Sequence, residues 1–455
     1  MNVLLINPWI YDFAAYDLWM KPVGLLYIAS LLEKLGHHVS LINCLDRYHP
    51  LLQRDFKNRL PPTRKYDCGK FFFQEVEKPD CLRRIPRKFK RFGITPQILE
   101  EELSRLNPSP EVVGITSGMT YWYLGVFEVI KTVKRKFPEV PVILGGIYAT
   151  LCYEHAKFFS GADYVIQGRG EREILRILNE ISGIKTNCSS EPSRFYEDGE
   201  IFPAYHLLPS VRSVAILTSR GCPFSCNYCA SSLLEPLFTQ RDPLKVVKEI
   251  NYYIQKFKIQ DIAFYDDALL VNAKEHIIPL LEEIIKSQPG VRLHTPNGLH
   301  ARYIDENIAL LLRRANFKTL RISFESTNPK IQKSSSGKVS NEDLIEACYN
   351  LKKAGFKPRE IEVYVMVGFP DQEVEEVLET IRFVHHLQIK IKLAEFSPIP
   401  GTPLFSRIAK HFKLLQEEPL LHNNLAFPLW HSKIDYYRLE EIKREVANIN
   451  CKLPE

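Results

Sequence analysis

The chain has 455 residues, of which 45% are apolar and 25% are charged, and this length suits two or three domains that each bury a core. With 11% aromatic residues and no heptad or collagen repeat, the composition excludes a disordered, collagen-like or coiled-coil protein. No apolar run of about 18 residues is available to cross a membrane, and the first residues lack the basic and apolar regions of a secretory signal, so we expect a cytoplasmic protein.

The net charge of +6 is concentrated in one segment. Residues 51–100 carry thirteen Lys and Arg against six Asp and Glu, a surplus of seven, which leaves minus one for the rest of the chain. A basic insert of this kind is more often a solvated loop than a nucleic-acid site, so we do not expect nucleic-acid binding. A connection this long is more often functional than idle, and we expect it to act as a lid or a substrate-recognition element.

The first 182 residues alternate apolar strand patterns with helical patterns, as in a parallel sheet with crossover helices. Strands are predicted at residues 3–8, 38–44, 112–118, 140–146 and 164–168, and helices at 22–36 and 168–181. The strands are continuously apolar, which is typical of a sheet covered on both faces. We therefore predict a doubly wound, Rossmann-like α/β domain over residues 1–182, with the basic insert at about 50–100.

Small residues follow the later strands of this domain. The turns contain Ser117, Gly118, Gly145, Gly146 and Gly168. Ligands of open α/β sheets bind beyond the carboxyl ends of the strands, where small residues let a ligand approach the backbone. These five residues are therefore predicted to line a ligand site, although the fold alone does not identify the ligand.

A polar segment at residues 183–205 separates this domain from a second α/β series. Its Asp198-Gly199 pair is flanked by apolar residues, a pattern typical of a hairpin turn, so a linker with a small hairpin is predicted. Six further strands are predicted at residues 214–219, 261–265, 291–295, 319–325, 362–367 and 390–396, with a helical pattern in each interval. This series predicts a partial (β/α)6 barrel over residues 206–400, with its site at the strand carboxyl ends, and a helical tail at 401–455.

Three of the ten cysteines stand within eight residues, directly after a predicted strand. Cys222, Cys226 and Cys229 have the spacing CxxxCxxC, and thiolates are soft ligands that favour zinc, copper(I) or iron-sulfur clusters. A closed zinc site usually takes four ligands in paired short spacings, and no such partner lies nearby in the sequence. Three thiolates on an iron-sulfur cube leave one iron open to a substrate or cofactor, whereas three merely buried cysteines would rarely have this spacing.

These cysteines, with Tyr228 just before the third, resemble the motif of the radical S-adenosylmethionine (SAM) superfamily, and the resemblance covers about residues 206–405. It implies that the three cysteines hold a 4Fe-4S cluster and that SAM chelates the fourth iron. It also implies that an electron from the cluster cleaves SAM into methionine and a 5'-deoxyadenosyl radical, which abstracts hydrogen from a substrate. A flavodoxin or ferredoxin is the expected electron donor.

Further residues at predicted strand ends match positions where this superfamily contacts SAM. Where relatives have a GGE-type motif, this chain has Asp266 and Asp267, either of which offers an acceptor for the SAM amino group. The remaining candidates are Asn297, Glu325, Ser326 and Gly368. For Asp267 or Glu325 taken alone, a helix cap or a surface ion pair is an equally common role.

The first domain resembles the cobalamin-binding domain that precedes the barrel in one branch of the superfamily. The resemblance lies in the segment at residues 21–39, in the VVGITSG and VILGG turns, and in GADYVIQGRGE. The DxHxxG motif that ligates cobalt elsewhere is absent. The most similar segment is Asp46-Arg47-Tyr48-His49, which lacks the glycine of the motif. The resemblance implies a cobalamin-dependent methylation of an unactivated carbon, with a second SAM recharging methylcobalamin.

Several alternatives remain open at this point. The same layout resembles enzymes that perform cyclisation or rearrangement, and a radical SAM reaction without cobalamin is a further possibility. Methylthiotransferases of that class carry an additional cysteine triad in their first domain, which this chain lacks. A non-catalytic iron-sulfur or zinc module is the alternative outside the enzymes. Cys68 and Cys81 in the insert are either extra ligands or, more commonly for such thiols, inert, and the substrate is a small molecule or peptide that the sequence does not identify.

Overall fold

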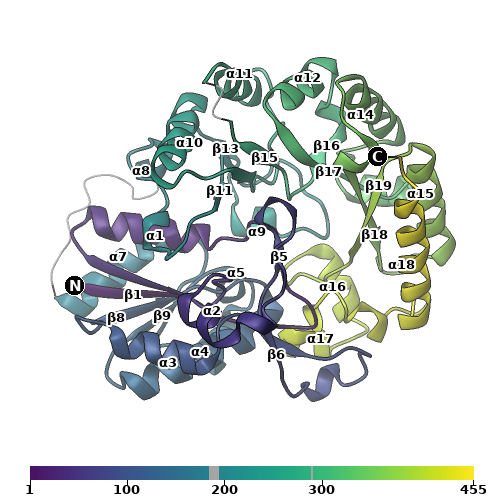
Figure 1. The fold of residues 1–455 in the computed structure, drawn as a ribbon. Coiled ribbons are helices and arrows are strands. Elements are labelled where there is room, and N and C mark those ends of the chain that lie inside the picture. Colours follow the sequence, from purple (N-terminus) through teal and green to yellow (C-terminus); the bar gives the residue numbers. More distant parts are fainter. Residues whose placement is uncertain (184–193, 288–289, 455) are drawn as a thin grey trace. The chain divides into compact units, whose positions relative to one another are not determined.

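The computed structural model of the protein describes residues 1–183, 194–287 and 290–454 (Figure 1). These residues form two compact units. The first unit comprises Met1–Arg83, Arg87–Val214 and Glu417–Leu420, and the second comprises Arg84–Pro86, Ala215–Gln416 and Leu421–Glu455. The two units are described separately below.

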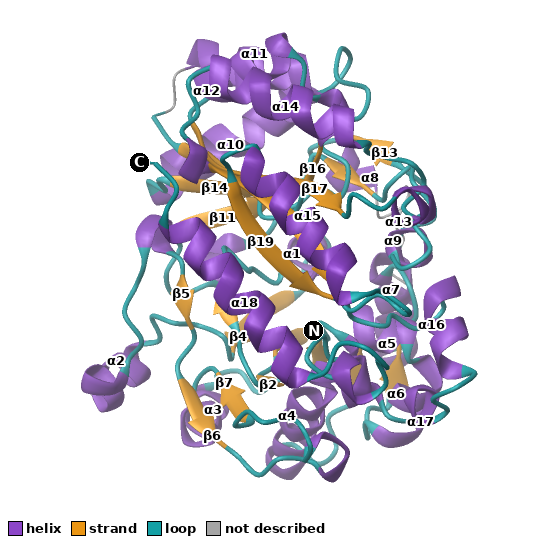
Figure 2. Ribbon diagram, turned by 90° about the vertical axis from the view of Figure 1, so that its right-hand side faces the viewer, coloured by secondary structure: helices purple, strands orange, loops and turns teal. Residues whose placement is uncertain are grey.

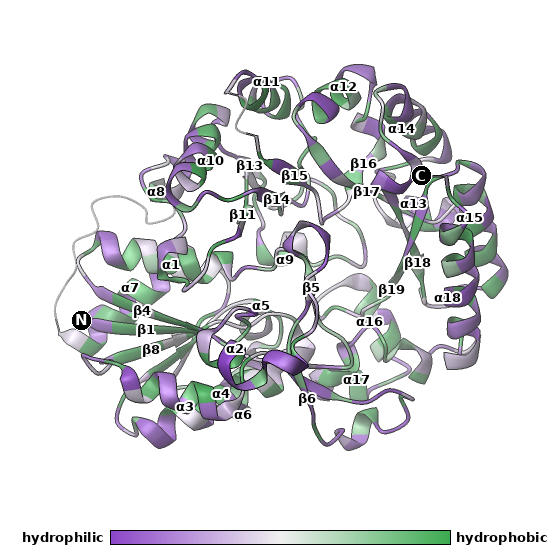
Figure 3. Ribbon diagram, in the orientation of Figure 1, coloured by the Kyte–Doolittle hydropathy of each residue, from purple (hydrophilic) through white to green (hydrophobic). Residues whose placement is uncertain are grey.

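The first unit is built on a five-stranded parallel sheet with the order β10-β9-β8-β1-β4. Its strands are β1 (Asn2–Asn7), β4 (His38–Asn43), β8 (Val112–Ile115), β9 (Val142–Leu144) and β10 (Tyr164–Val165). Figure 3 shows β1, β4 and β8 as hydrophobic strands between helices that lie on both sides of the sheet. The predicted doubly wound α/β domain is therefore confirmed.

The helices of this unit bury their apolar stripes against the sheet. They are α1 (Val23–Lys34), α2 (Pro50–Phe56), α3 (Pro96–Arg105), α4 (Tyr123–Lys136), α5 (Ile147–Leu151), α6 (Tyr153–Phe159), α7 (Gly170–Ser182) and α8 (Arg194–Glu197). Leu32 of α1 and Leu178 of α7 share one buried cluster with Leu5 of β1. Burial of each such leucine side chain stabilises the folded state by about 2 kcal/mol, so these leucines hold the helices against the sheet.

The basic insert forms small sheets with a segment that directly follows β1. The order β2-β7-β6 joins β2 (Ile10–Asp12), β7 (Lys90–Phe92) and β6 (Phe73–Glu75), while β3 (Tyr16–Asp17) pairs with β5 (Gly69–Lys70). Phe71 and Phe92 are buried in one cluster with Ile10. Much of the insert is therefore packed structure, and these short strands were not predicted.

The hairpin predicted at Asp198-Gly199 is wrong. Residues 184–193 lie outside the described residues, and those that follow form α8, which ends at the pair. Gly199 has a φ of 68° and donates its N–H to the Tyr196 carbonyl at 3.0 Å, and the Glu200 N–H donates to the Phe195 carbonyl at 2.8 Å. This is the Schellman arrangement, in which a left-handed glycine ends a helix, so the same glycine preference serves a helix end here instead of a turn.

The second unit contains a six-strand parallel path with the order β11-β14-β15-β17-β18-β19. The strands are β11 (Ser213–Ile216), β14 (Asp261–Phe264), β15 (Arg292–His294), β17 (Phe317–Glu325), β18 (Ile361–Val367) and β19 (Lys390–Glu395), and β16 (Leu299–His300) pairs with β17. β11 and β19 are the two edges, so within the described residues the sheet is an open partial barrel. The predicted partial (β/α)6 fold is confirmed.

A helix follows each of the first five strands on the outside of this arc (Figure 1). The long helices are α10 (Pro243–Phe257), α11 (Ile277–Ser287), α12 (Glu306–Arg314), α14 (Asn341–Lys353) and α15 (Val374–His386). Their starts are fixed by side-chain caps: Asp242 accepts the Leu244 N–H at 2.7 Å, and Asp305 accepts the Ile308 N–H at 2.8 Å. Each cap satisfies an N–H that has no partner within its helix.

The remaining elements are short connections and the C-terminal helices. They are β12 (Ser219–Arg220), β13 (Thr239–Gln240), α9 (Ser231–Leu234), α13 (Pro329–Ser334), α16 (Pro403–Ala409), α17 (Leu414–Glu417) and α18 (Tyr436–Cys451). Figure 2 shows α15 and α18 side by side over β19. Within α18, the Asn450 amide accepts the Ile391 N–H at 2.9 Å and donates to the Ile391 carbonyl at 2.8 Å, so it satisfies the backbone of the edge strand β19.

We predict that Asn450→Ala lowers the free energy of unfolding by about 1–2 kcal/mol, because both backbone groups of Ile391 lose their partner. The measurement is a urea unfolding curve monitored by circular dichroism. Asn448→Ala is the matched control, because Asn448 is an exposed residue of the same helix. Equal midpoints for the two variants would contradict the role of Asn450.

Candidate functional site

The three clustered cysteines lie on a loop between the short strands β12 and β13. β12 and β13 pair as antiparallel strands, so the two ends of the cysteine loop lie next to each other. Gly221 begins the loop with a φ of 74°, and a Cβ there would lie 2.9 Å from the Leu237 carbonyl oxygen. Only glycine fits this position, and the residue after it is Cys222.

The thiols of the loop are partly buried and close enough to influence one another. Burial raises the pKa of Cys222 to about 11, and the neighbouring Cys226 and Cys229 contribute in the same direction. The Ser231 N–H donates to the Cys229 Sγ at 3.5 Å, and the Ser231 hydroxyl lies 3.3 Å from the same sulfur. Three thiols on one loop, with a backbone N–H donor to the sulfur of Cys229, suit an iron-sulfur cluster, which is held by thiolates and tuned by such donors.

Among residues 1–183, 194–287 and 290–454, no three His, Cys, Asp or Glu side chains have the spacing of a ligand set for one metal ion. An iron-sulfur cube is held at separate iron corners, so its thiolates stand farther apart than the ligands of a single ion. The residues present therefore fit the cluster by donor type and by their place on one loop.

The two candidate aspartates have different roles. Asp266 is buried, and its carboxylate accepts hydrogen bonds from the Thr218 N–H at 2.9 Å, the Thr218 hydroxyl at 2.7 Å and the Ser219 hydroxyl at 2.6 Å. Burial raises the pKa of Asp266, although these donors oppose the shift. Asp266 thus connects the end of β14 to the chain that leads into the cysteine loop.

Asp267 lies beside the cysteines. Its side chain is exposed, and its carboxylate accepts a hydrogen bond from the Ser231 hydroxyl at 2.9 Å. The same hydroxyl contacts Cys229, and the Asp267 charge adds to the raised pKa of Cys222. Of the two carboxylates, Asp267 is the one available to a ligand at the loop.

Asn297 supports this region from the next strand. Its amide donates to the Tyr265 carbonyl at 2.9 Å and to the Asp266 carbonyl at 3.5 Å. These bonds fix the loop that carries Asp267. The contact of Asn297 with SAM stays a prediction.

A buried ion pair that the sequence did not reveal lies near the cysteines. The Lys338 ammonium is 2.9 Å from Glu325 Oε1 and 3.4 Å from the Tyr228 hydroxyl, and its charge acts to lower the pKa of Cys226. Burial disfavours the charged form of Lys338, but Glu325, Tyr228 and Cys226 together outweigh burial and raise the pKa of Lys338. Lys338 follows three serines and a glycine, without any periodic or motif signal.

Glu325 keeps one carboxylate oxygen available. Its backbone has a φ of 69°, a left-handed conformation that costs a non-glycine residue about 1 kcal/mol or more. Oε2 is buried without a hydrogen-bond partner in the described residues. An unpaired buried acceptor is costly, so this oxygen is suited to receive a ligand N–H or O–H.

Ser326 and Gly368 are enclosed by protein. Ser326 is fully buried, and its hydroxyl accepts the Asn328 N–H at 3.1 Å. Gly368 has a φ of 96°, and a Cβ there would lie 2.7 Å from the Phe427 ring. Their predicted roles in cofactor binding remain predictions.

The predicted turn residues of the first unit meet at one edge of its sheet. The Ser117 hydroxyl donates to the Gly145 carbonyl at 2.6 Å, and a Cβ on Gly146 would lie 2.4 Å from the Ser117 carbonyl oxygen. The Gly168 N–H donates to the Thr150 hydroxyl at 3.0 Å. Gly118 packs against the Trp122 ring, which a Cβ would approach to 2.8 Å. Close backbone approach therefore holds the loops after β8 and β9 together, and a hydrogen bond to Thr150 joins the loop after β10 to them.

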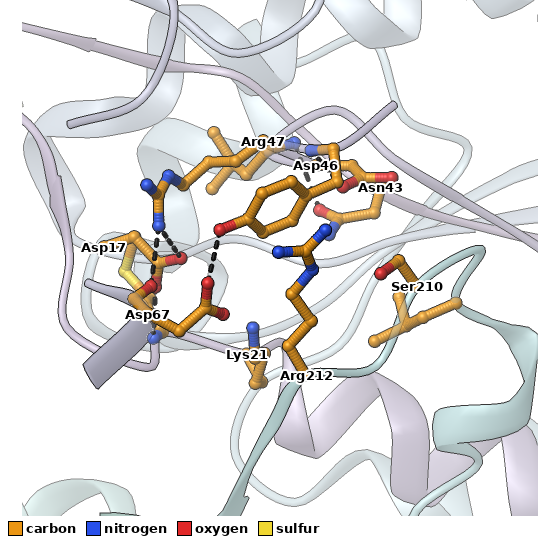
Figure 4. A pocket seen from close by; sticks show the side chains of 12 residues that line it. Asp17, Lys21, Asn43, Asp46, Arg47, Asp67, Ser210 and Arg212 are labelled. Carbon is orange, nitrogen blue, oxygen red and sulfur yellow. Dashed lines mark hydrogen bonds and ion pairs between the residues drawn. The ribbon is translucent and has the colours of Figure 1, made fainter. Parts of the chain in front are cut away.

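A polar pocket that the sequence did not predict lies past the end of β4 in the first unit (Figure 4). Its lining residues are Asp17, Met20, Lys21, Asn43, Leu45, Asp46, Arg47, Tyr48, Asp67, Leu208, Ser210 and Arg212. The Arg212 guanidinium stacks on the Tyr48 ring at 3.9 Å from its centre. His49, the histidine of the Asp46-Arg47-Tyr48-His49 segment, does not line this pocket. Its Nε2 lies 3.8 Å from the Glu102 carboxylate.

The insert cysteines have ordinary thiol environments. Cys68 is buried, and its Sγ lies 3.6 Å from the Tyr66 carbonyl oxygen. Burial raises the pKa of Cys81 to about 12, and the nearby Glu418 adds to the shift.

Two family models match parts of this chain. The family model described as Radical SAM superfamily matches residues 216–384, and the model described as B12 binding domain matches residues 94–178. Among the described residues, no helix has the length and apolar character to span a membrane.

Two relatives illustrate the similarity in sequence. The "Uncharacterized methyltransferase PH0819" of Pyrococcus horikoshii is 30% identical over 324 residues, 65% of this chain and 69% of that protein. The anaerobic magnesium-protoporphyrin IX monomethyl ester cyclase of Rubrivivax gelatinosus is 23% identical over 350 residues, 70% of this chain and 62% of that protein. The chain thus spans between three fifths and seven tenths of the length of these relatives.

A solved structure shares the fold. The radical S-adenosylmethionine methyltransferase TsrM from Kitasatospora setae, with tryptophan and a SAM analogue bound, matches with a TM-score of 0.65 and 18% identity. The match covers 90% of this chain and 76% of TsrM. The two family matches and the cysteine loop confirm the expected resemblance and its cofactors, a 4Fe-4S cluster, SAM and cobalamin. The chain belongs to the radical SAM superfamily, in the branch that carries a B12-binding domain.

Proposed function

We propose that the protein catalyses a cobalamin-dependent radical SAM methylation of an unactivated carbon. The observation that carries this proposal is the presence, in one chain, of the three-thiol loop and of a B12-binding domain whose strand-end turns gather at one sheet edge. The names of the Pyrococcus relative and of TsrM, both methyltransferases, support the same reaction.

In this proposal Cys222, Cys226 and Cys229 ligate the cluster, and Asp267 and Glu325 bind SAM. When bound, the cluster and SAM supply a 5'-deoxyadenosyl radical, and cobalamin supplies the methyl carrier. Glu325 Oε2 is the buried acceptor for a ligand donor, and Asp267 offers an exposed carboxylate beside Cys229. Asp266 and Asn297 act indirectly, since their bonds hold the loops that carry these groups.

The remaining assignments belong to the same proposal. The functional domains are residues 1–182 and 206–400, with the insert at about 50–100 acting as a lid or recognition element. Ser117, Gly118, Gly145, Gly146 and Gly168 line the cobalamin side. Tyr228 packs edge-on against Phe369, with ring centres 5.4 Å apart, and supports the cluster loop. The electron donor is a flavodoxin or ferredoxin, the location is cytoplasmic, and the substrate is a small molecule or peptide.

A second candidate reaction is cyclisation without methyl transfer. It is favoured by the Rubrivivax relative, which is named a cyclase and matches 70% of this chain. Both reactions use the same cluster and the same radical, so only the fate of the SAM methyl group separates them.

The decisive experiment supplies the anaerobically reconstituted protein with cobalamin, a strong reductant and SAM that carries a trideuterated methyl group. We expect 5'-deoxyadenosine to form and the label to appear in the cobalamin fraction, as detected by mass spectrometry. Formation of 5'-deoxyadenosine without labelled cobalamin would favour cyclisation, and absence of 5'-deoxyadenosine would favour a non-catalytic module.

Cys226→Ala is expected to abolish iron and sulfide binding and 5'-deoxyadenosine formation, because the cluster loses one of its three thiolate ligands. Iron and sulfide assays with visible spectra provide the measurement. The matched control is Cys451→Ala, because Cys451 is exposed at the end of α18. Full iron content in the Cys226 variant would refute the ligand assignment.

Lys338→Met is expected to lower the reduction potential of the cluster, because the reduced cluster carries one more negative charge and loses a nearby cation. An electron paramagnetic resonance titration of the reconstituted protein measures this potential. Lys333→Met is the control, since Lys333 is an exposed residue of the preceding helix α13. An unchanged or higher potential in Lys338→Met would show that the lysine does not act on the cluster.

A further inference from the structure

The sheet of the second unit has one apolar face and one polar face. On β18, Val363, Val365 and Val367 alternate with Glu362 and Tyr364, and the three valines are fully buried. Because α15 packs against β18 and is buried along its own apolar stripe, the valines face the outer helices. The polar residues therefore face the inside of the partial barrel, since successive strand residues point to opposite sides.

A row of charged residues crosses this inner face. Arg321, Glu362 and Lys390 are direct neighbours in the register of β17, β18 and β19. Arg321 Nε donates to Glu362 Oε2 at 3.0 Å, and Lys390 bonds to the other oxygen of the same carboxylate. Each oxygen of the Glu362 carboxylate is therefore paired with one cation, and the three side chains of this row together carry a net positive charge.

The next row toward the strand ends contains Ser323, Tyr364 and Lys392, again direct neighbours in the register. The Tyr364 hydroxyl donates to the Pro296 carbonyl at 2.9 Å. Lys392 is exposed, and no carboxylate of the described residues lies within ion-pairing distance of its ammonium group. The nearby Glu395 pairs with Lys443 at 2.8 Å.

The surroundings of Lys392 disfavour its charge. Burial lowers its pKa, and the nearby Arg321 acts in the same direction, while Glu362 opposes it. An exposed lysine that lies near other cations and has no carboxylate within ion-pairing distance is stabilised by an anion that binds to it.

We infer that Lys392 binds an anionic oxygen group of the substrate, a carboxylate or a phosphate, on the inner face of the partial barrel. The hydroxyl of Ser323, two strands away in the same row, adds a donor on the same face. This inference rests on the proposed function, because it takes the bound molecule to be the substrate of that reaction. It adds that the substrate carries an anionic group. The neighbouring row of Arg321, Glu362 and Lys390 adds positive charge near Lys392. Its side chains pair with one another, so they are not available to bind the substrate.

The first test measures how fast an amine-specific acetylating reagent modifies Lys392 in the full-length reconstituted protein, by peptide mass spectrometry at constant ionic strength. Inorganic phosphate or acetate is expected to slow this labelling by roughly tenfold, because the lysine must break a charge-assisted hydrogen bond before it reacts. Lys410, exposed at the end of α16, is the internal control, and acetamide is the uncharged counterpart of acetate. Equal effects on Lys392 and Lys410, or no effect of either anion, would overturn the inference.

The second test compares variants by the concentration of phosphate or acetate that stabilises each against thermal unfolding. Lys392→Met is expected to weaken anion binding by roughly tenfold, Lys392→Arg to retain most of it, and Lys410→Met to change nothing. Unchanged binding in Lys392→Met would overturn the inference. The two arms show whether a carboxylate or a phosphate is preferred, and their outcome is independent of methyl transfer, so the two proposals fail separately.

Discussion

The hydrogen bonds that the Asp266 carboxylate accepts from Thr218 and Ser219 are the interaction on which the cysteine loop depends. They join the end of β14 to the chain that leaves β11, at the point where it turns toward Cys222. The Arg241 N–H donates to the Thr218 carbonyl at 2.9 Å as the chain returns, so exit and re-entry are fixed together. A cluster ligand set on a loop needs such support, because a flexible loop would pay the ordering entropy each time the cluster is assembled.

The sequence was sufficient to predict the two α/β sheets, the approximate positions of their main strands along the chain and the cysteine loop. Continuous apolar runs and a three-thiol spacing are local patterns, so they can be recognised in the sequence without knowledge of the tertiary structure. Lys338 has no such signal, because its partners Glu325 and Tyr228 come from other parts of the chain. The choice between Asp266 and Asp267 likewise depends on which carboxylate is buried, and the hairpin at Gly199 failed because a left-handed glycine serves turns and helix ends alike.

Charge is used differently in two parts of the second unit. Lys338 is buried and paired, so its charge is fixed near Cys226 and contributes a constant field there. Lys392 is exposed and unpaired among the described residues, so its charge is available to a molecule that enters. The first arrangement suits the control of a cofactor and the second suits recognition. Lys338 lies in the connection between α13 and α14, and Lys392 lies on β19.

The contact between Asn450 and the backbone of Ile391 has a consequence for association between molecules. An open barrel has two free margins, and an unprotected margin is a template on which another polypeptide can continue the sheet. The asparagine amide imitates a neighbouring peptide group and occupies the hydrogen-bonding positions of one residue, while α18 covers the strand beside it. The contact therefore hinders the addition of another strand at the β19 margin of the open barrel.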